Sequence, residues 1–129
     1  MILIIGGAYQ GKLEYAKSQY HVTDAEIFTC TGTEIDFSKR CIDHLEEFTF
    51  ACVRDGMDAI AFFQAHQALW QDSILICEDI SSGVVPMGAD IREWRQVTGR
   101  LCQYLSGQAD RVSRIFCGLE QRLTCAPFI

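Results

Sequence analysis

The segment Gly6-Gly7-Ala8-Tyr9-Gln10-Gly11-Lys12 has the spacing G-x-x-x-x-G-K. Glycines at these positions let successive backbone N–H groups curl around phosphate oxygens, and a lysine at the end supplies a point charge for the outer phosphates. The segment follows the apolar run 2–5 and opens a stretch with helical propensity, which is the context that such a loop requires. The sequence therefore predicts a nucleotide- or phosphate-binding loop; the alternative is a glycine turn followed by a surface lysine.

Leu13 stands directly after this lysine. Ser or Thr usually occupies this position, because its hydroxyl helps to hold Mg²⁺. Leucine has no ligand atom, and Glu14 adds negative charge beside the expected phosphate site. We expect backbone amides and Lys12 to support phosphate binding at residues 6–13, and metal-assisted phosphoryl transfer to be impaired.

Glu78 and Asp79 follow the apolar run 73–77, which reads as a buried strand. Ligands of open α/β sheets bind at the carboxyl ends of the strands, where a carboxylate can organise Mg²⁺ directly or through water. These two residues are therefore candidate metal ligands, with Asp79 as a candidate catalytic residue. The alternative is a pair of solvated acids at a strand end.

Arg92 and Arg95 are three residues apart on the longest expected helix, 89–108, and so share one helical face. Two guanidinium groups on one face can bind an anion, which makes this pair a candidate substrate-binding site. A solvated face on which they pair with Asp90 and Glu93 is the alternative.

The remaining pattern alternates strands with helices, which predicts one α/β domain over residues 1–129 with a largely parallel sheet. We expect a further edge strand in the tail that ends at Ile129. The expected strands cover residues 2–5, 26–30, 73–77 and 111–117, and the expected helices cover residues 11–20, 38–48 (with Ser38 as N-cap), 57–70 and 89–108.

The net charge of the chain argues against some classes of binding partner. The formal net charge is −6, whereas a general binder of nucleic acid or of anionic membranes usually carries the opposite sign. No targeting signal and no apolar run of membrane-spanning length is visible, so a cytoplasmic protein is expected. The seven cysteines are scattered without a C-x-x-C motif and are expected to be reduced core residues, a zinc site being the alternative.

Five segments in order resemble the adenosylcobinamide kinase / adenosylcobinamide-phosphate guanylyltransferase family: GGAYQGK, EDISSGVVP, REWRQVTGRLCQYL, QADRV and FCGL. The resemblance implies a three-layer, RecA-like P-loop NTPase fold and a homo-oligomer. It also implies that ATP or GTP, with Mg²⁺, phosphorylates a hydroxyl of adenosylcobinamide in cobalamin biosynthesis. GMP is then transferred from GTP through a guanylylated histidine.

Carried over by position, Gly6, Gly7, Gly11 and Lys12 match the family's phosphate loop. Asp79 falls on the acidic residue of the family's N-E-V-G segment, and Arg92 and Arg95 fall on the two arginines of its R-x-F-R-D helix pattern. Arg40 and His44 keep the spacing of R-I-x-x-H, which would make His44 the nucleotidyl carrier.

The sequence departs from the family at Leu13 and lacks an internal strand that normally reads D-C-L-T-L-W. The expected function is therefore a cobinamide kinase, with guanylyltransferase activity if His44 serves. The alternative is a catalytically degenerate nucleotide- or corrinoid-binding module with a regulatory or assembly role.

Overall fold

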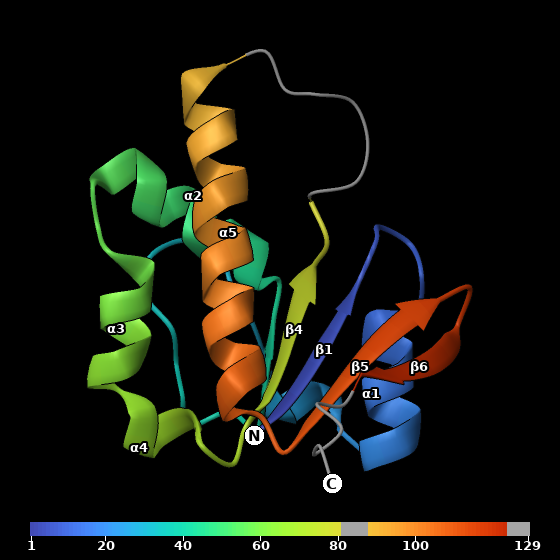
Figure 1. Cartoon of the computed structure of the whole chain (residues 1–129). Helices are drawn as coiled ribbons and strands as arrows, with labels where there is room; N and C mark the ends of the chain where they lie inside the picture. Colours follow the sequence, from blue (N-terminus) through green and yellow to red (C-terminus); the bar gives the residue numbers. More distant parts are fainter. Residues whose placement is uncertain (81–87, 124–129) are drawn as a thin grey trace, which may run out of the picture.

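The computed structural model describes residues 1–80 and 88–123. Its centre is a six-stranded sheet with the strand order β2-β3-β4-β1-β5-β6, in which only β6 runs antiparallel to its neighbour. Helices lie on both faces of this sheet (Figure 1). The strands are β1 (Ile2–Gly6), β2 (Ile27–Thr29), β3 (Cys41–Asp43), β4 (Ile74–Glu78), β5 (Arg111–Phe116) and β6 (Leu119–Leu123).

The helices divide between the two faces. A short 3-10 turn, Asp24–Glu26, leads into β2. Helix α1 (Lys12–Tyr20) covers one face, where Ile4, Ile76 and Ile115 form a core with Ala16. The other face carries the larger core, and its helices are α2 (Leu45–Asp55), α3 (Ala59–Ala65), α4 (Gln67–Trp70) and α5 (Ala89–Gln108).

The two central strands are buried on both faces, as their continuous apolar runs predicted. Leu3 and Ile4 of β1 are fully buried on opposite faces, and Ile74 to Cys77 of β4 are all buried. Successive side chains of a strand point to opposite faces, so a strand covered by helices on both sides needs apolar residues at every position. The α/β fold with a mostly parallel sheet is thus confirmed.

The predicted helix over residues 38–48 is wrong. Cys41 to Asp43 form β3 in the interior of the sheet, and the helix begins only at Leu45, after His44 in the left-handed region (φ 60°). Strand β3 also corrects the expectation that an internal strand is missing, because it lies between β2 and β4 both in sequence and in the sheet. Its three residues are all buried, so tertiary packing outweighs the local helical pattern.

Other boundaries need smaller corrections. The expected helix 57–70 is divided at His66 into α3 and α4, and Asp58 caps α3 by accepting a hydrogen bond from the Ala61 N–H (3.1 Å). The expected edge strand in the tail is present as β6. The predicted core role of the cysteines holds for Cys30, Cys41, Cys52 and Cys77, whereas Cys102 is half-buried and Cys117 is exposed.

Part of the family-like segment, with Gly83, Val85 and Pro86, lies outside the described residues. Within the part of the chain that is described, none of the helices has both the length and the apolar character needed to cross a bilayer.

Candidate functional site

The loop between β1 and α1 has the geometry that its glycines predicted. Tyr9 and Gly11 both adopt positive φ, at 60° and 90°, so the chain turns sharply back on itself before α1. Gly11 is the N-cap of α1, and its carbonyl accepts the hydrogen bond from the Tyr15 N–H (2.9 Å). The loop therefore opens directly onto a helix N-terminus, where a partial positive charge favours anions.

Gly6 fixes where the loop leaves the sheet. Its carbonyl accepts a hydrogen bond from the Asp79 N–H (2.7 Å), which extends the pairing of β1 with β4 by one residue. On the other side, a Cβ placed on Gly6 would lie 2.6 Å from the carbonyl oxygen of Ile115. Only glycine allows β1 and β5 to approach this closely at the start of the loop.

Gln10 ties the loop to the β5–β6 hairpin. Its carbonyl accepts a hydrogen bond from the Gly118 N–H (2.9 Å), and its side-chain Oε1 accepts one from the Cys117 N–H (2.7 Å). Cys117 and Gly118 form the two-residue hairpin turn and both adopt positive φ, as such a turn requires. This contact spans more than a hundred residues of sequence, and no local signal could have predicted it.

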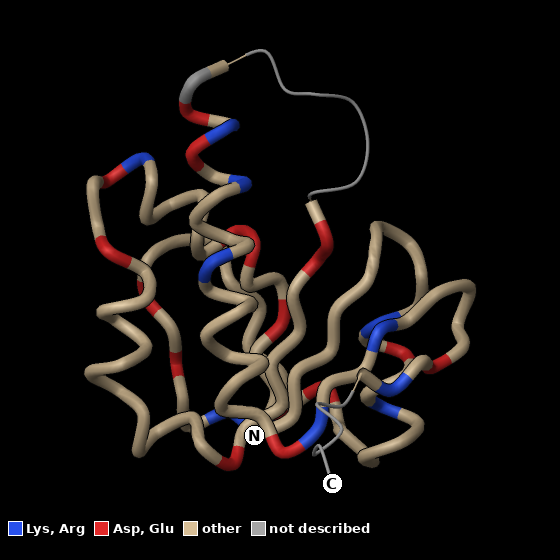
Figure 2. The backbone as a smooth tube through the Cα atoms, viewed as in Figure 1, with Lys and Arg blue, Asp and Glu red and all other residues tan. Residues whose placement is uncertain are grey.

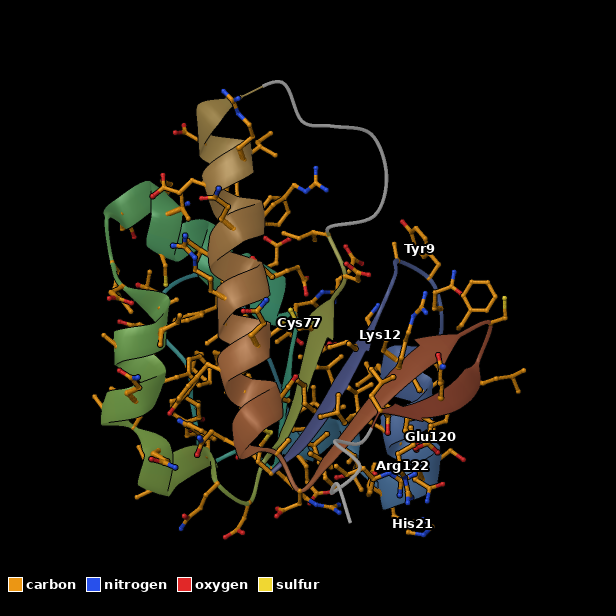
Figure 3. All side chains as sticks on the ribbon, in the orientation of Figure 1. Tyr9, Lys12, His21, Cys77, Glu120 and Arg122 are labelled. Atoms are coloured by element: carbon orange, nitrogen blue, oxygen red, sulfur yellow. The ribbon has the colours of Figure 1, made fainter. Side chains whose placement is uncertain are left out.

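Lys12 lies inside the loop. Its side chain is 9% exposed, and its Nζ donates a hydrogen bond to the Gly7 carbonyl (2.6 Å). In Figure 3, Lys12 lies beneath the loop, whereas Tyr9 projects from its tip into solvent. A pocket of about 410 Å³ opens here, and it is lined by Ala8, Tyr9, Gly11, Lys12, Leu13, Glu14, Asp43, His44 and Glu78.

Asp43 brings a buried carboxylate to this pocket. It ends β3, is 5% exposed and points to the same face of the sheet as Lys12. Burial raises the pKa of Asp43, while the charge of His44, its backbone N–H (2.8 Å) and the Lys12 ammonium act in the opposite direction. The sequence prediction missed Asp43 because residues 38–48 were read as a helix. The apolar pair Cys41-Ile42 directly before the acidic Asp43 is the signal that could have found it, because a short buried strand that ends at a carboxylate has this pattern.

Glu46 connects three elements beneath the pocket. It is 2% exposed, and its Oε1 accepts a hydrogen bond from the Glu78 N–H at the end of β4 (2.9 Å). Its Oε2 lies 2.7 Å from His44 Nδ1, and its carbonyl accepts a hydrogen bond from the Trp94 indole of α5 (2.8 Å). The first turn of α2 thereby fixes the positions of the His44 ring and the Glu78 backbone.

The sequence was compared with known protein families. The sequence profile of the family "Cobinamide kinase / cobinamide phosphate guanyltransferase" matches residues 51–123, which is 73 of 129 residues. The chain belongs to this family. A search of the curated proteins found no match of significance.

The cobinamide kinase / guanyltransferase match runs from within α2 to the end of β6. The match does not include the loop at 6–13 or strand β3. The pocket residues in these two segments are therefore assigned from the structure and from the sequence pattern, and not from the family match. The members of this family are nucleotide-dependent transferases that act on cobinamide in cobalamin biosynthesis.

The structure brings together some of the residues predicted for this family's site and leaves others apart. Lys12, Leu13, His44 and Glu78 line one pocket, along with Ala8, Tyr9 and Gly11. Gly7 contributes the carbonyl that accepts from Lys12. The acidic residues at the end of β4 are visible in Figure 2, but the pocket lining includes Glu78 and not its neighbour Asp79.

Arg92 and Arg95 of α5 also lie outside the pocket lining. Arg92 is exposed and Arg95 is half-buried, on the first turns of the helix. Their predicted role in substrate binding therefore requires the acceptor to extend from the pocket toward α5.

The donor set around Lys12 fits Mg²⁺ bound together with phosphate. Mg²⁺ is usually held by one or two carboxylates, water and substrate phosphates rather than by a complete protein cage. Asp43 and Glu78 supply two such carboxylates, whereas Leu13 supplies none. Among residues 1–80 and 88–123 no cluster of three or more His, Cys, Asp or Glu could hold a metal ion by itself.

The pKa of the His44 imidazole reports on the charges around this site. Burial favours the neutral imidazole, but the hydrogen bond to Glu46 and the charges of Asp43, Glu46 and Glu78 outweigh burial, so the pKa of His44 is raised above 6.5. Stability from protonated His44 is fully present below its unfolded pKa and is lost as the pH rises through the higher folded value.

We expect Glu46→Gln to lower the pKa of His44, because glutamine keeps the shape of the side chain and removes its charge. NMR titration of the imidazole measures this pKa directly. Glu47→Gln is the matched control, since Glu47 is adjacent in sequence and exposed. Equal pKa values of His44 in the two variants would contradict the assignment of Glu46 as the side-chain partner.

Proposed function

We propose that this protein binds ATP or GTP through residues 6–13 and transfers the terminal phosphoryl group to a hydroxyl of adenosylcobinamide. In this proposal residues 1–129 form a single P-loop nucleotide-binding domain of the RecA-like type. The observation that carries it is the buried Lys12, held at the mouth of a helix N-terminus in a pocket that also contains Asp43 and Glu78.

The strand order supports this assignment. The loop follows β1, and Asp43 and Glu78 end β3 and β4; in the sheet β4 lies next to β1, and β3 lies next to β4. All three strands are parallel, so their carboxyl ends meet at one edge, where open α/β sheets bind their ligands.

The charges of the pocket argue that a divalent cation accompanies the nucleotide. Glu14, Asp43 and Glu78 line the pocket along with one lysine. A triphosphate would meet these carboxylates at close range, where charge repulsion is poorly screened. Bound Mg²⁺ would neutralise part of this charge and of the charge that develops during phosphoryl transfer. Asp43 and Glu78 are the residues that we assign to hold it.

Besides the bound metal ion, the Lys12 ammonium supplies a positive charge for the phosphate groups. Its Nζ is within the loop and donates to the Gly7 carbonyl, so a small side-chain rotation can redirect it to a phosphate oxygen. A preorganised charge in a buried site stabilises a phosphoryl transition state more than an exposed one does.

His44 is the residue that we assign to a guanylyl-transfer step. Glu46 holds its Nδ1 (2.7 Å), and Nε2, which lies 3.7 Å from Asp43 Oδ2, is the nitrogen that would attack the α-phosphorus of GTP. The attack would form an N–P bond and release pyrophosphate, and the acceptor phosphate would then displace the histidine. Arg92 and Arg95 remain the candidates for binding an anionic group of the acceptor.

Leu13 favours a second candidate, a nucleotide- or corrinoid-binding module that has lost catalysis. Its side chain lines the pocket where the family carries a metal-holding hydroxyl. Both candidates share small-molecule ligands rather than nucleic acid or membrane, in keeping with the net charge of −6, and a cytoplasmic location.

Restoring the hydroxyl tests the importance of this residue. We expect Leu13→Ser to tighten Mg²⁺-dependent nucleotide binding by about 10-fold, because the serine hydroxyl can serve as a ligand of the cation and one polar contact to a charged group contributes at least about this much. Leu13→Ala is the control, because it removes the leucine side chain without adding a ligand. Calorimetric titration measures both, and equal affinities would mean that the hydroxyl position is not used.

The proposed function is tested by calorimetric titration with GTP and ATP, with and without Mg²⁺, followed by incubation with adenosylcobinamide. Formation of adenosylcobinamide phosphate by the wild type, and its loss in Asp43→Asn, supports the kinase. Nucleotide binding without product supports the binding module. Absence of nucleotide binding under all of these conditions contradicts the kinase and a nucleotide-binding module alike.

A further inference from the structure

His44 has a backbone conformation that the surrounding structure must impose. Its φ of 60° and ψ of 49° lie in the left-handed region, which is uncommon for residues other than glycine. Its N–H donates a hydrogen bond to Asp43 Oδ1 (2.8 Å), and its carbonyl accepts one from the Glu47 N–H (3.0 Å). Strained conformations of this kind persist where several contacts fix them, and they concentrate at functional sites. The contacts of the turn that follows His44 are therefore informative.

Helix α5 holds this turn, which is the first turn of α2. The two helices pack against each other on one face of the sheet (Figure 1). The indole Nε1–H of Trp94 donates to the Glu46 carbonyl (2.8 Å) and to Thr49 Oγ1 (3.1 Å). Thr49 Oγ1 in turn donates to the same Glu46 carbonyl (3.0 Å). A side chain of α5 is thus bonded to the backbone of α2 two residues after His44.

A second hydroxyl group completes this network. Thr49 is fully buried and Thr98 of α5 is 3% exposed, and their Oγ1 atoms lie 2.6 Å apart. Because Thr49 gives its only hydroxyl proton to the Glu46 carbonyl, Thr98 is the donor of this pair. All of these donors therefore converge on the Glu46 carbonyl, either directly or through Thr49. A buried polar network whose members are all satisfied specifies one arrangement of the elements that it joins.

We propose that Trp94 is a positioning residue for His44, and that it acts by fixing the first turn of α2 through the Glu46 carbonyl. The inference rests on the proposed function, in which His44 carries the guanylyl group. Trp94 does not belong to the pocket lining, so it acts through Glu46 and not on the nucleotide. Thr49 and Thr98 support it, because they bond to the same carbonyl or to each other.

The side chain of Glu46 passes this positioning on to the imidazole. Its Oε2 lies 2.7 Å from His44 Nδ1, and a carboxylate at one ring nitrogen keeps the proton there and the lone pair on the other. Nε2 is then the nucleophile that the guanylyl transfer requires. Trp94 also lies between Arg92 and Arg95, the candidates for binding the acceptor. The network therefore fixes the carrier histidine relative to the helix that would hold the acceptor.

The charges around His44 provide a readout of this positioning. Carboxylates from three elements raise its pKa, and the first of them in effect is Glu46 through its hydrogen bond. Only Glu46 among them is bonded to the Trp94 indole. The charged groups that surround His44 are Asp43 of β3, Glu46 of α2, Glu78 of β4, and Lys12 and Glu14 of α1. Displacement of Glu46 alone should therefore lower the pKa of His44 while the other groups stay in place.

NMR titration of the His44 imidazole in Trp94→Phe tests the proposal. Phenylalanine keeps an aromatic ring beside Phe50 and removes the N–H donor, so we expect a lower pKa of His44 than in the wild type. Trp70→Phe is the matched control, because the Trp70 indole also donates to a backbone carbonyl, that of Phe63 (2.7 Å), and Trp70 lies on α4 outside the pocket.

Two further variants keep the test decisive if Trp94→Phe folds poorly. Thr98→Val keeps the shape of a buried side chain and removes one donor of the network, so it should shift the pKa of His44 in the same direction. In a Glu46→Gln background, Trp94→Phe should lower the pKa no further, because residues that act through one another are not additive.

Labelling of the protein by GTP that carries the label on its α-phosphate measures the guanylyl transfer itself. At a pH above the His44 pKa of each variant, all imidazoles are neutral, and the rate then reports position. We expect Trp94→Phe to lower the maximal labelling rate about 10- to 100-fold, the usual cost of a misplaced reacting group, and to leave the KM for GTP unchanged. Trp70→Phe should be labelled at the wild-type rate.

An unchanged pKa of His44 in the folded network variants, or an equal change in Trp70→Phe, would overturn the proposal. So would a further fall of the pKa when Trp94→Phe is added to Glu46→Gln, because the indole would then act by another route. A wild-type labelling rate in Trp94→Phe, or a raised KM with an unchanged maximal rate, would also contradict it. Absence of labelling in the wild type would contradict the guanylyl-transfer step alone, because the pKa is measured without nucleotide.

Discussion

Replacing Lys12 by methionine is expected to weaken the binding of Mg²⁺-bound GTP or ATP by about 100-fold, because about 1.5–3 kcal/mol is lost with each hydrogen bond to a charged group. The ammonium is the one lysine or arginine side chain that lines the pocket in residues 1–80 and 88–123, where three carboxylates already repel phosphate. Methionine keeps the apolar stem that packs beside Gly6, so the loss reports the charge rather than the packing.

Calorimetric titration or fluorescent-nucleotide binding measures this loss. Lys17→Met is the matched control: Lys17 lies on the same helix, is 41% exposed and pairs with Asp24 on the surface (2.7 Å). Removing an exposed ion pair of this kind changes stability little, because solvent screens the two charges, and it leaves the pocket intact. If both variants bind nucleotide as the wild type does, residues 6–13 do not form the nucleotide site.

Long local patterns were read correctly from the sequence. The apolar runs of β1 and β4 predicted strands buried on both faces, and the spacing of Leu101 and Leu105 predicted the long helix α5 whose buried side this pair marks. The glycine spacing predicted where the loop turns, because positive φ at Gly11 is a local requirement of the chain. These features depend on residues that are close in sequence, so they can be predicted from the sequence alone.

The missed features depend on distant contacts. Strand β3 has three residues, too few to show a periodicity of two, and only its position between β2 and β4 makes it a strand. Asp43 and Glu46 become parts of the site because β3 ends beside β4, as the Glu46 bond to the Glu78 N–H shows. Neither side chain was predicted to belong to the site. Tertiary contacts, not composition, make them buried.

Gly6→Ala is expected to destabilise the fold by about 1–3 kcal/mol, the usual cost of forcing an extra methyl group into a packed site. The methyl carbon would lie 2.6 Å from the Ile115 carbonyl oxygen, and that oxygen belongs to the backbone of β5, which cannot rotate away as a side chain can. Relief requires β1 and β5 to separate at the point where Gly6 pairs with Ile115.

Gly7→Ala separates this effect from a general loss of glycine flexibility. A Cβ on Gly7 would meet only Gln10 Cγ, at the ordinary distance of 3.7 Å, and Gly7 is not among the glycines with positive φ. Alanine there reduces the entropy of the unfolded chain without a clash, so its stability should equal or slightly exceed that of the wild type. Urea unfolding measures both variants, with an unchanged m-value showing that the comparison concerns the same folded state. Equal stability of the two variants would mean that the sheet yields at Gly6, and that the tight approach of β1 to β5 is not what sets the start of the phosphate loop.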